Sequence, residues 1–286
     1  MSRVADTPLP AREVRYAAPI WRQWNLIWNF AQRDRKAQFK GSALGWLWSL
    51  VVPLATLGIY SLVFAVVMRV APPPFGNGRE GIFSVFLFSG LVSWGFFTNS
   101  IQTGMLGLLG TGQLLKKIYF PAYAPVLGSV VFVGIQSLIE MSLLLVVLAL
   151  LGNISWTWLL VPLWAVPFIV FVSSLAVGLA IYNVYARDLS HLVSVAMQLL
   201  FYLSPIIYPL TLVPESGTFW GVTIPARAIM EASPLTQFFG LFRCLVYDLS
   251  PGSIYSWLYV VVAAILALVW AARVYQRRAG DLGELV

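Results

Sequence analysis

The chain has 286 residues, of which only 10 % are charged, and its mean hydropathy is +0.82. A soluble domain normally carries about 25 % charged residues, so this composition excludes a water-soluble globular protein and indicates an integral membrane protein. The single cysteine, Cys244, and the single histidine, His191, exclude an internal disulfide and a Cys/His metal cluster.

The net charge of +7 does not indicate a nucleic-acid-binding protein. The excess Lys and Arg residues lie in the N-terminal arm and beside apolar runs, where anionic lipid headgroups attract basic side chains. We therefore expect membrane lipids, and no nucleic acid, among the partners of this chain.

Residues 1–19 mix charges with short apolar stretches and contain no hydrophobic core of a signal peptide, so we expect a cytoplasmic N-terminal extension. Residues 20–40 have apolar side chains at helical spacing, with polar side chains on the other faces. The apolar set is Ile20, Trp24, Ile27, Trp28 and Ala31. This pattern predicts an amphipathic helix lying in the cytoplasmic interface of the membrane; a soluble helix that packs on a partner is the alternative.

Six apolar segments follow, each long enough to cross a hydrocarbon core of roughly 30 Å. They are predicted at about residues 46–68, 82–108, 124–151, 158–182, 192–210 and 254–272, within a transmembrane domain at residues 44–275. Residues 212–251 are too polar to span and too apolar for a free loop, so we expect short external helices there that dip into the membrane surface, between spans five and six. Residues 276–286 are the expected cytoplasmic tail. The predicted fold class is therefore an all-α integral membrane protein with six transmembrane helices preceded by an interface helix.

The distribution of basic residues sets the predicted orientation. With the N-terminus inside, 14 of the 18 Lys and Arg residues fall on the cytoplasmic side. Because cytoplasmic loops carry the excess of basic residues, we expect both termini in the cytoplasm.

Residues 107–114, GLLGTGQL, have the glycine spacing of a phosphate-binding loop. However, Gln113 and Leu114 stand where that motif needs Lys and Ser or Thr, and no strand precedes the segment. We therefore expect no nucleotide site, no catalytic residues and no metal site on this chain, so that any ATP is hydrolysed by a separate polypeptide.

Two short cytoplasmic connections combine charges with bulky apolar residues: residues 113–125, which contain Lys116 and Lys117, and residues 182–193, which contain Arg187 and Asp188. This composition is typical of segments inserted into a partner's cleft. It is equally typical of basic anchoring at the membrane surface, with Asp188 capping a helix.

Glu140 is the one acid deep within a predicted span. A charged residue there costs on the order of 2.5–3.5 kcal/mol on insertion scales, so this side chain must be neutral, paired or in contact with water. A structural hydrogen bond between spans, a place beside a conduit and proton coupling are the three open interpretations.

Four segments carry a resemblance to a known family. They are FAQRDRKAQFKGSALGWLWSLVVPLATLGIYSLVF (30–64), LLKKIYFP (114–121), YARDLSHLVSVAMQLLFYLSPIIYP (185–209) and SPLTQFFGLFR (233–243). In this order they resemble the permease subunits of type-2 ABC exporters for O-antigen, teichoic acid and related polysaccharides. The N-terminal extension and the Ala/Val/Arg-rich composition resemble the mycobacterial galactan exporters within that family.

The resemblance implies a homodimer of six-span subunits, each docked on an ATPase subunit that holds ATP and Mg. It assigns the contact with that ATPase to Lys116, Lys117, Ile118, Tyr119, Arg187 and Asp188, and the external gate to Pro234 and Arg243. The cargo implied is an undecaprenyl- or decaprenyl-pyrophosphate-linked glycan.

The same resemblance implies a conduit lined by spans one and five. Its candidate aromatic residues are Tyr60, Phe64, Phe201, Tyr202 and Tyr208. The candidates for attracting the lipid pyrophosphate are Arg33, Arg35, Lys36 and Lys40; ordinary anchoring to headgroups explains these basic residues equally well.

The leading hypothesis is thus the permease of an ATP-driven exporter that moves a lipid-linked polysaccharide, such as galactan, outward. A drug or small-lipid exporter shares the six-span plan. A membrane-embedded glycosyltransferase or acyltransferase would need paired carboxylates or a His base, and Asp34, Asp188 and Asp248 are isolated in the sequence. An ion-coupled transporter or channel would need more intramembrane polar residues.

Overall fold

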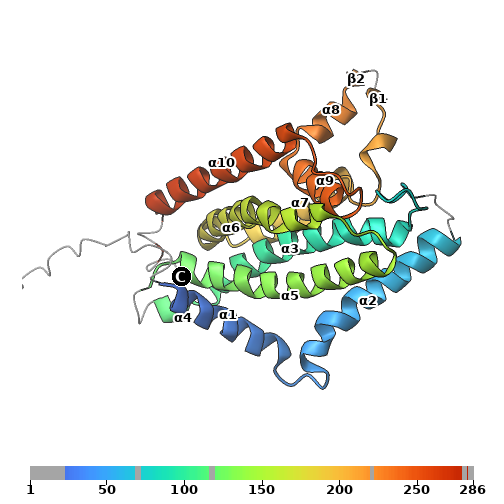
Figure 1. Cartoon of the computed structure of the whole chain (residues 1–286). Coiled ribbons are helices and arrows are strands. Elements are labelled where there is room, and N and C mark those ends of the chain that lie inside the picture. The colour runs from blue at the N-terminus through green and yellow to red at the C-terminus, as the bar shows by residue number, and fades with distance from the viewer. Residues whose placement is uncertain (1–22, 68–71, 116–119, 220–221, 279–281, 283–286) are drawn as a thin grey trace, which may run out of the picture.

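The computed structural model describes residues 23–67, 72–115, 120–219, 222–278 and 282. Four long helices form the body of the molecule and run side by side (Figure 1). They are α3 (Phe83–Leu109), α5 (Tyr123–Leu150), α6 (Val161–Tyr185), which the 3-10 turn Trp156–Leu160 precedes, and α10 (Ile254–Arg278). Each is long and apolar enough to cross a membrane.

Helix α3 is the most buried of the four and occupies the centre of the bundle, in contact with both α5 and α6. Helix α10 covers the other side of α6. The two helices approach closely at Gly178, where any side chain would collide with the indole ring of Trp270. Apolar side chains on the outer faces of α5, α6 and α10 are exposed, as expected where lipid replaces water as the solvent.

The segment before the bundle forms α1 (Trp24–Phe39), a short 3-10 turn (Gly45–Leu47), α2 (Trp48–Tyr60) and a π-helical continuation (Ser61–Val67). Helix α1 packs its buried residues Ile27, Phe30 and Ala31 against the beginning of α5. The contact is close because α5 has Gly128 there: a Cβ at this position would lie 2.5 Å from the Cβ of Phe30. Helix α2 is inclined to the bundle (Figure 1) and exposes most of its apolar side chains.

Helix α7 (Leu189–Leu203) is shorter than the predicted fifth span. It ends where the sequence reaches Pro205, since the residue before a proline favours extended backbone and Ser204 has φ −89° and ψ 144°. The helix therefore ends at the Ser204–Pro205 break inside the predicted fifth span, and the extent of that span to residue 210 stays a prediction.

The segment after α7 contains a 3-10 turn (Leu210–Leu212), strands β1 (Gly217–Phe219) and β2 (Val222–Ile224), α8 (Ala226–Glu231) and α9 (Pro234–Val246). The two strands pair antiparallel, which corrects the expectation of helices alone. Helix α9 begins with Pro234 in its first turn, a favoured position for proline. Its residues Phe238, Phe239 and Phe242 are fully buried, so α9 is part of the core and does not merely lie on a membrane surface.

At each of the two ends of the helix bundle, hydrogen bonds join helix ends to the segments that connect the helices. At one end, Asn153 donates hydrogen bonds to the carbonyls of Val246 and Tyr247, and the Tyr247 hydroxyl donates to the carbonyl of Pro73. At the other end, the Tyr185 hydroxyl donates to the carbonyl of Arg278. Helices α3, α5 and α6 thus alternate in direction, and α6 and α10 end on the same side. The count of six spans stays a prediction, because α2 and α7 are shorter apolar helices.

Candidate functional site

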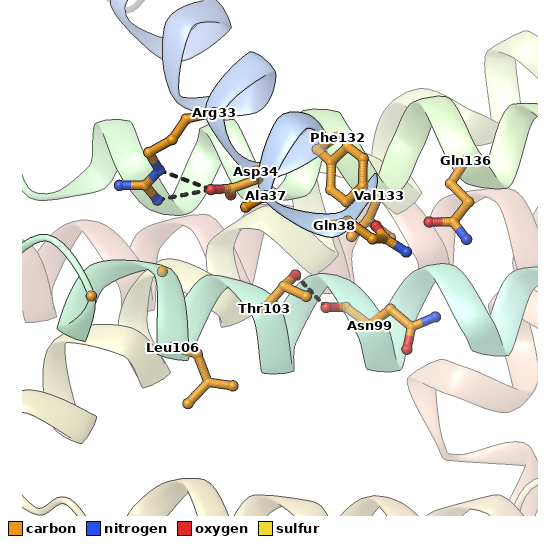
Figure 2. Close-up of a pocket in the computed structure, with 12 residues that line it drawn as sticks. Arg33, Asp34, Ala37, Gln38, Asn99, Thr103, Leu106, Phe132, Val133 and Gln136 are labelled. Atoms are coloured by element: carbon orange, nitrogen blue, oxygen red, sulfur yellow. Dashed lines mark hydrogen bonds and ion pairs between the residues drawn. The ribbon is translucent and has the colours of Figure 1, made fainter. Parts of the chain in front are cut away.

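A polar cavity of about 710 Å³ lies between α1, α3 and α5 (Figure 2). Each helix contributes one face to it. The lining residues are Arg33, Asp34, Ala37 and Gln38 from α1, Asn99, Thr103, Leu106, Gly107 and Gly110 from the α3 segment, and Phe132, Val133 and Gln136 from α5. Residues four apart on a helix share a face, which explains how Asn99, Thr103 and Gly107 reach one side of the apolar helix α3.

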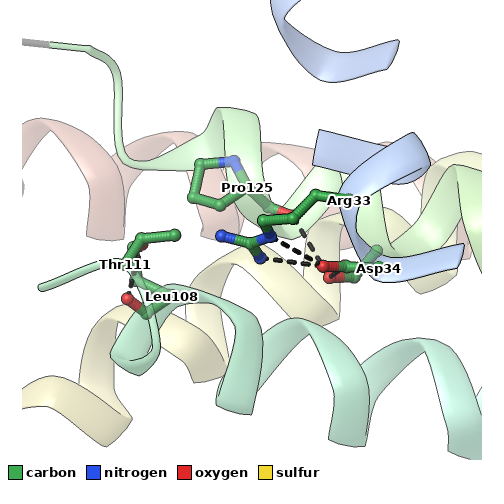
Figure 3. Close-up of polar contacts among 6 residues, drawn as sticks. Arg33, Asp34, Leu108, Thr111 and Pro125 are labelled. Atoms are coloured by element: carbon green, nitrogen blue, oxygen red, sulfur yellow. Dashed lines mark hydrogen bonds and ion pairs between the residues drawn. The ribbon is translucent and has the colours of Figure 1, made fainter. Parts of the chain in front are cut away.

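An ion pair within α1 lies at the edge of this cavity, and a hydrogen bond joins it to α5. The Arg33 side chain donates from Nε and Nη2 to Oδ1 of Asp34, at 3.0 and 2.8 Å (Figure 3). The hydroxyl of Ser129 donates to Oδ2 of Asp34 at 2.6 Å. The Arg33 guanidinium also lies 5.0 Å from the centre of the Phe30 ring. Both oxygens of Asp34 are therefore engaged, and the positive charge of Arg33 is balanced by a neighbouring carboxylate.

The four basic residues predicted to attract pyrophosphate lie on α1 and at its C-cap, and this role stays a prediction. Arg33 lines the cavity, whereas Arg35, Lys36 and Lys40 are exposed and are not among its lining residues. The uncharged polar residues of the site were not among the predicted residues. These are Gln38, Asn99, Thr103 and Gln136. Their one available signal was the occurrence of polar side chains at helical spacing inside apolar segments.

Glu140 lies one helical turn beyond Gln136 on α5, on the side that faces α3. A Cβ built on Gly95 of α3 would lie 3.8 Å from Oε2 of Glu140 and 3.9 Å from Nδ2 of Asn99. Among the described residues, the Glu140 side chain has no hydrogen bond or ion pair, so none supplies the partner that the structural interpretation needs. Its position connects it with the polar face of α3 that lines the cavity.

The predicted ATPase-contact residues Arg187 and Asp188 occupy the turn between α6 and α7, and both are exposed. Asp188 precedes α7, but its side chain makes no capping hydrogen bond. Asn183 supplies this interaction instead, because its Oδ1 accepts a hydrogen bond from the backbone N–H of Ser190 at 3.0 Å. The capping interpretation of Asp188 is therefore wrong. Lys116, Lys117, Ile118 and Tyr119 lie outside the described residues.

The aromatic residues predicted to line a conduit form two groups. Tyr60 and Phe64 lie 6.0 Å apart, and Phe64 contacts Phe83 at the beginning of α3. Phe201 contacts Trp94 in the middle of α3 and Tyr202 beside it. The Tyr208 hydroxyl donates to the carbonyl of Tyr202 at 3.0 Å. No ring contact joins the two groups within the part of the chain that the structure describes, and their role in a conduit stays a prediction.

Arg243, predicted at an external gate, is buried on α9 and hydrogen-bonds to the backbone where helix α7 ends. Its guanidinium donates to the carbonyls of Pro205 and Ile206 and to the hydroxyl of Ser89, and it lies 4.0 Å from the centre of the Phe86 ring. Pro234, the other gate candidate, only begins the same helix.

The carboxyl of Asp248 lies in the connection after α9. Burial raises its pKa from the usual value, and the positive charge of Arg243 partly opposes this shift. The guanidinium of Arg243 forms its hydrogen bonds with the carbonyls of Pro205 and Ile206 and with Ser89, and no ion pair with Asp248 occurs among the described residues.

These features define a multi-pass helical membrane protein with a polar cavity between its helices. Residues 25–247 match the family model described as "ABC-2 type transporter". The chain therefore belongs to the ABC-2 transporter family, and it is a membrane permease subunit of the type-2 ABC class.

Several curated relatives match most of the chain. It is 31 % identical over 213 residues to the O-antigen export system permease protein RfbA of Klebsiella pneumoniae, an alignment that covers 73 % of this chain and 78 % of the relative. It is 28 % identical over 281 residues to a protein of the same name from Myxococcus xanthus, which covers 96 % of this chain and 100 % of the relative.

Proposed function

We propose that this permease belongs to an ATP-driven exporter that moves a lipid-linked polysaccharide from the cytoplasmic to the external side of the bacterial plasma membrane. The observation that carries the proposal is the similarity to O-antigen export permeases along nearly the whole chain, from the interface helix to the last span. Galactan attached to undecaprenyl or decaprenyl pyrophosphate is the cargo we propose.

The geometry supports a substrate with a polar and an apolar part. The polar cavity lies beside α1, whose face carries Trp24 and Trp28 stacked 6.5 Å apart and exposed. Tryptophan is enriched at the level of lipid headgroups, so α1 is suited to the membrane interface. A lipid that approaches α1 there would present its polar end at the height of the cavity.

ATP hydrolysis would be supplied by a separate ATPase subunit that binds ATP and Mg, in an assembly of two permeases and two ATPases. The exposed pair Arg187 and Asp188 is available for this contact, because neither side chain forms an ion pair with another described residue. Lys116 and Lys117 complete the proposed contact on the sequence resemblance alone.

The test is affinity purification from native membranes, followed by mass measurement of the intact complex and an ATPase assay. We expect a partner that carries a phosphate-binding loop, two copies of each chain, and ATP hydrolysis. Depletion of the permease in cells should leave lipid-linked polysaccharide on the cytoplasmic side. A permease that purifies without an ATPase, or a depleted strain that exports its polysaccharide normally, would contradict the proposal.

A further inference from the structure

Three side-chain amides from three different helices line the polar cavity. Gln38 comes from α1, Asn99 from α3 and Gln136 from α5, and Figure 2 shows their amide groups directed into the same space. Within the part of the chain that the structure describes, none of these amides makes a hydrogen bond to the protein. Each therefore offers one acceptor oxygen and two N–H donors to a ligand.

The charges around the cavity argue against an anionic ligand. Arg33 is the one basic residue in its lining, and its Nε and Nη2 are both directed at Asp34. Glu140, one turn beyond Gln136, adds a second carboxyl group near the cavity. Because Asp34 already balances the charge of Arg33, a phosphate group there would add negative charge without a free counter-charge in the lining and would lie near this acid.

The remaining groups of the cavity fit an uncharged ligand rich in hydroxyl groups. A hydroxyl donates one hydrogen bond and accepts others, as a primary amide does, so amides and hydroxyls form mutual hydrogen bonds. Thr103 adds a hydroxyl beside Asn99, and Phe132 and Leu106 add apolar surface. Pockets for small organic ligands combine apolar walls with a few polar groups in this way, and the volume lies within their usual range.

We propose that the cavity binds the hydroxyl groups of a sugar through the amides of Gln38, Asn99 and Gln136, and that it selects for the sugar end of the substrate and not for the pyrophosphate. This inference rests on the proposed function and names the part of the cargo that the site recognises. Arg33 then acts as a positioning residue, because it orients Asp34, which accepts the hydrogen bond from Ser129 that joins α1 to α5 at the edge of the site.

The experiment uses the full chain in lipid nanodiscs and two photoreactive probes, octyl galactoside and octyl phosphate. Labelled peptides are identified by mass spectrometry. We expect octyl galactoside to label residues 99–110 and 132–136, and labelling to fall about tenfold in Gln136→Leu and Asn99→Leu, as the loss of hydrogen bonds to the ligand predicts. Gln102→Leu is the matched control, because it removes an amide from α3 at a position that does not line the cavity.

Folding is checked by size-exclusion chromatography, and Gln38→Leu on the exposed face of α1 provides a third variant if a substitution inside the bundle prevents folding. Equal labelling of wild type and all folded variants would overturn the proposal, as would preferential labelling of the cavity by octyl phosphate. Either result is compatible with an ATPase complex that exports polysaccharide, so it is distinguishable from failure of the proposed function. That failure is detected by the separate purification and export assays.

Discussion

At the scale of single residues, Arg243 shows how the protein accommodates a charge in its core. The irregular backbone after α7 leaves the carbonyls of Pro205 and Ile206 without helical hydrogen-bond partners, and the guanidinium of Arg243 donates to both. Burial of a polar group is costly unless it is hydrogen-bonded. The arginine and the broken helix therefore stabilise each other, and Arg243 has a structural role at this end of the molecule.

We predict that Arg243→Ala destabilises the permease by at least about 2 kcal/mol, since an unsatisfied buried polar group costs about 1–3 kcal/mol. Thermal unfolding of the purified protein in detergent measures this effect. Arg227→Ala is the control, because Arg227 pairs only with Glu231 in a partly exposed i,i+4 contact and surface pairs contribute little. Equal unfolding temperatures for the two variants would contradict the structural role of Arg243.

At the scale of elements, the long helices were predictable because uninterrupted apolar runs leave the backbone no other partner in lipid. The expected segments 82–108 and 124–151 correspond to α3 and α5 within one residue at each end.

The burial of α9 was not predictable, since it depends on distant contacts such as the hydrogen bond from Trp164 Nε1 to the carbonyl of Phe238. The cavity was missed for the same reason: a sequence gives the spacing of Asn99 and Gln136 on their helices but not the rotation of one helix against the other.

The contact between α1 and α5 gives a second prediction. Gly128→Leu should detach α1, because even a Cβ at this position would lie 3.0 Å from the carbonyl oxygen of Ile27 and 3.1 Å from the backbone nitrogen of Ala31. Backbone atoms cannot rotate aside, so the helix itself must move. We expect faster trypsin cleavage within α1, at least about tenfold, because cleavage follows the population of the detached state.

The control for this substitution is Gly134→Ala on the same helix. A Cβ at that position meets only a ring carbon of Phe96, at 3.7 Å, which is an ordinary contact distance. Its cleavage rate should equal that of the wild type. If Gly128→Leu also left the rate unchanged, the close packing of α1 on α5 would be refuted.

The turn between α6 and α7 gives a third prediction. Reversing both charges, with Arg187→Glu and Asp188→Lys, should reduce export and the amount of bound ATPase at least about tenfold. The amount of permease in the membrane should not change, because both side chains are exposed and neither forms an ion pair with a described residue. Co-purification of the ATPase and an export assay measure the two effects. The matched control reverses Arg227 and Glu231 at the opposite end; ATPase binding that responded equally to both reversals would refute a specific contact at Arg187 and Asp188.

At the scale of the whole molecule, the segments that connect the helices lie at the two ends of the bundle, and the two ends differ in their number of exposed basic residues. The end that holds the turn after α6 and the end of α10 carries Arg187, Arg273, Arg277 and Arg278. The other end carries fewer exposed basic residues: Arg79, which donates to the carbonyl of Leu151, and Arg227, which pairs with Glu231, while Arg243 is buried in the core. The exposed positive charge is thus concentrated at one end, which is the arrangement that fixes the orientation of a membrane protein in the bilayer.

This asymmetry predicts that the end with Arg187 faces the cytoplasm and the end with Asn77 faces outward. After Cys244→Ser removes the single cysteine, Asn77→Cys should react with a membrane-impermeant maleimide in intact cells, and Arg187→Cys only after the membrane is opened. Asn77 is exposed and is joined to the carbonyl of Gly152, so one labelled position reports on two connections.

Cysteines introduced at Ser216 and Arg277 extend the test to both sides of α10, because an odd number of crossings must separate them if this helix spans the membrane. Labelling of Asn77→Cys and Arg187→Cys from the same side would contradict this orientation. It would require an even number of membrane crossings between the two residues, whereas α3, α5 and α6 alternate in direction and together give an odd number.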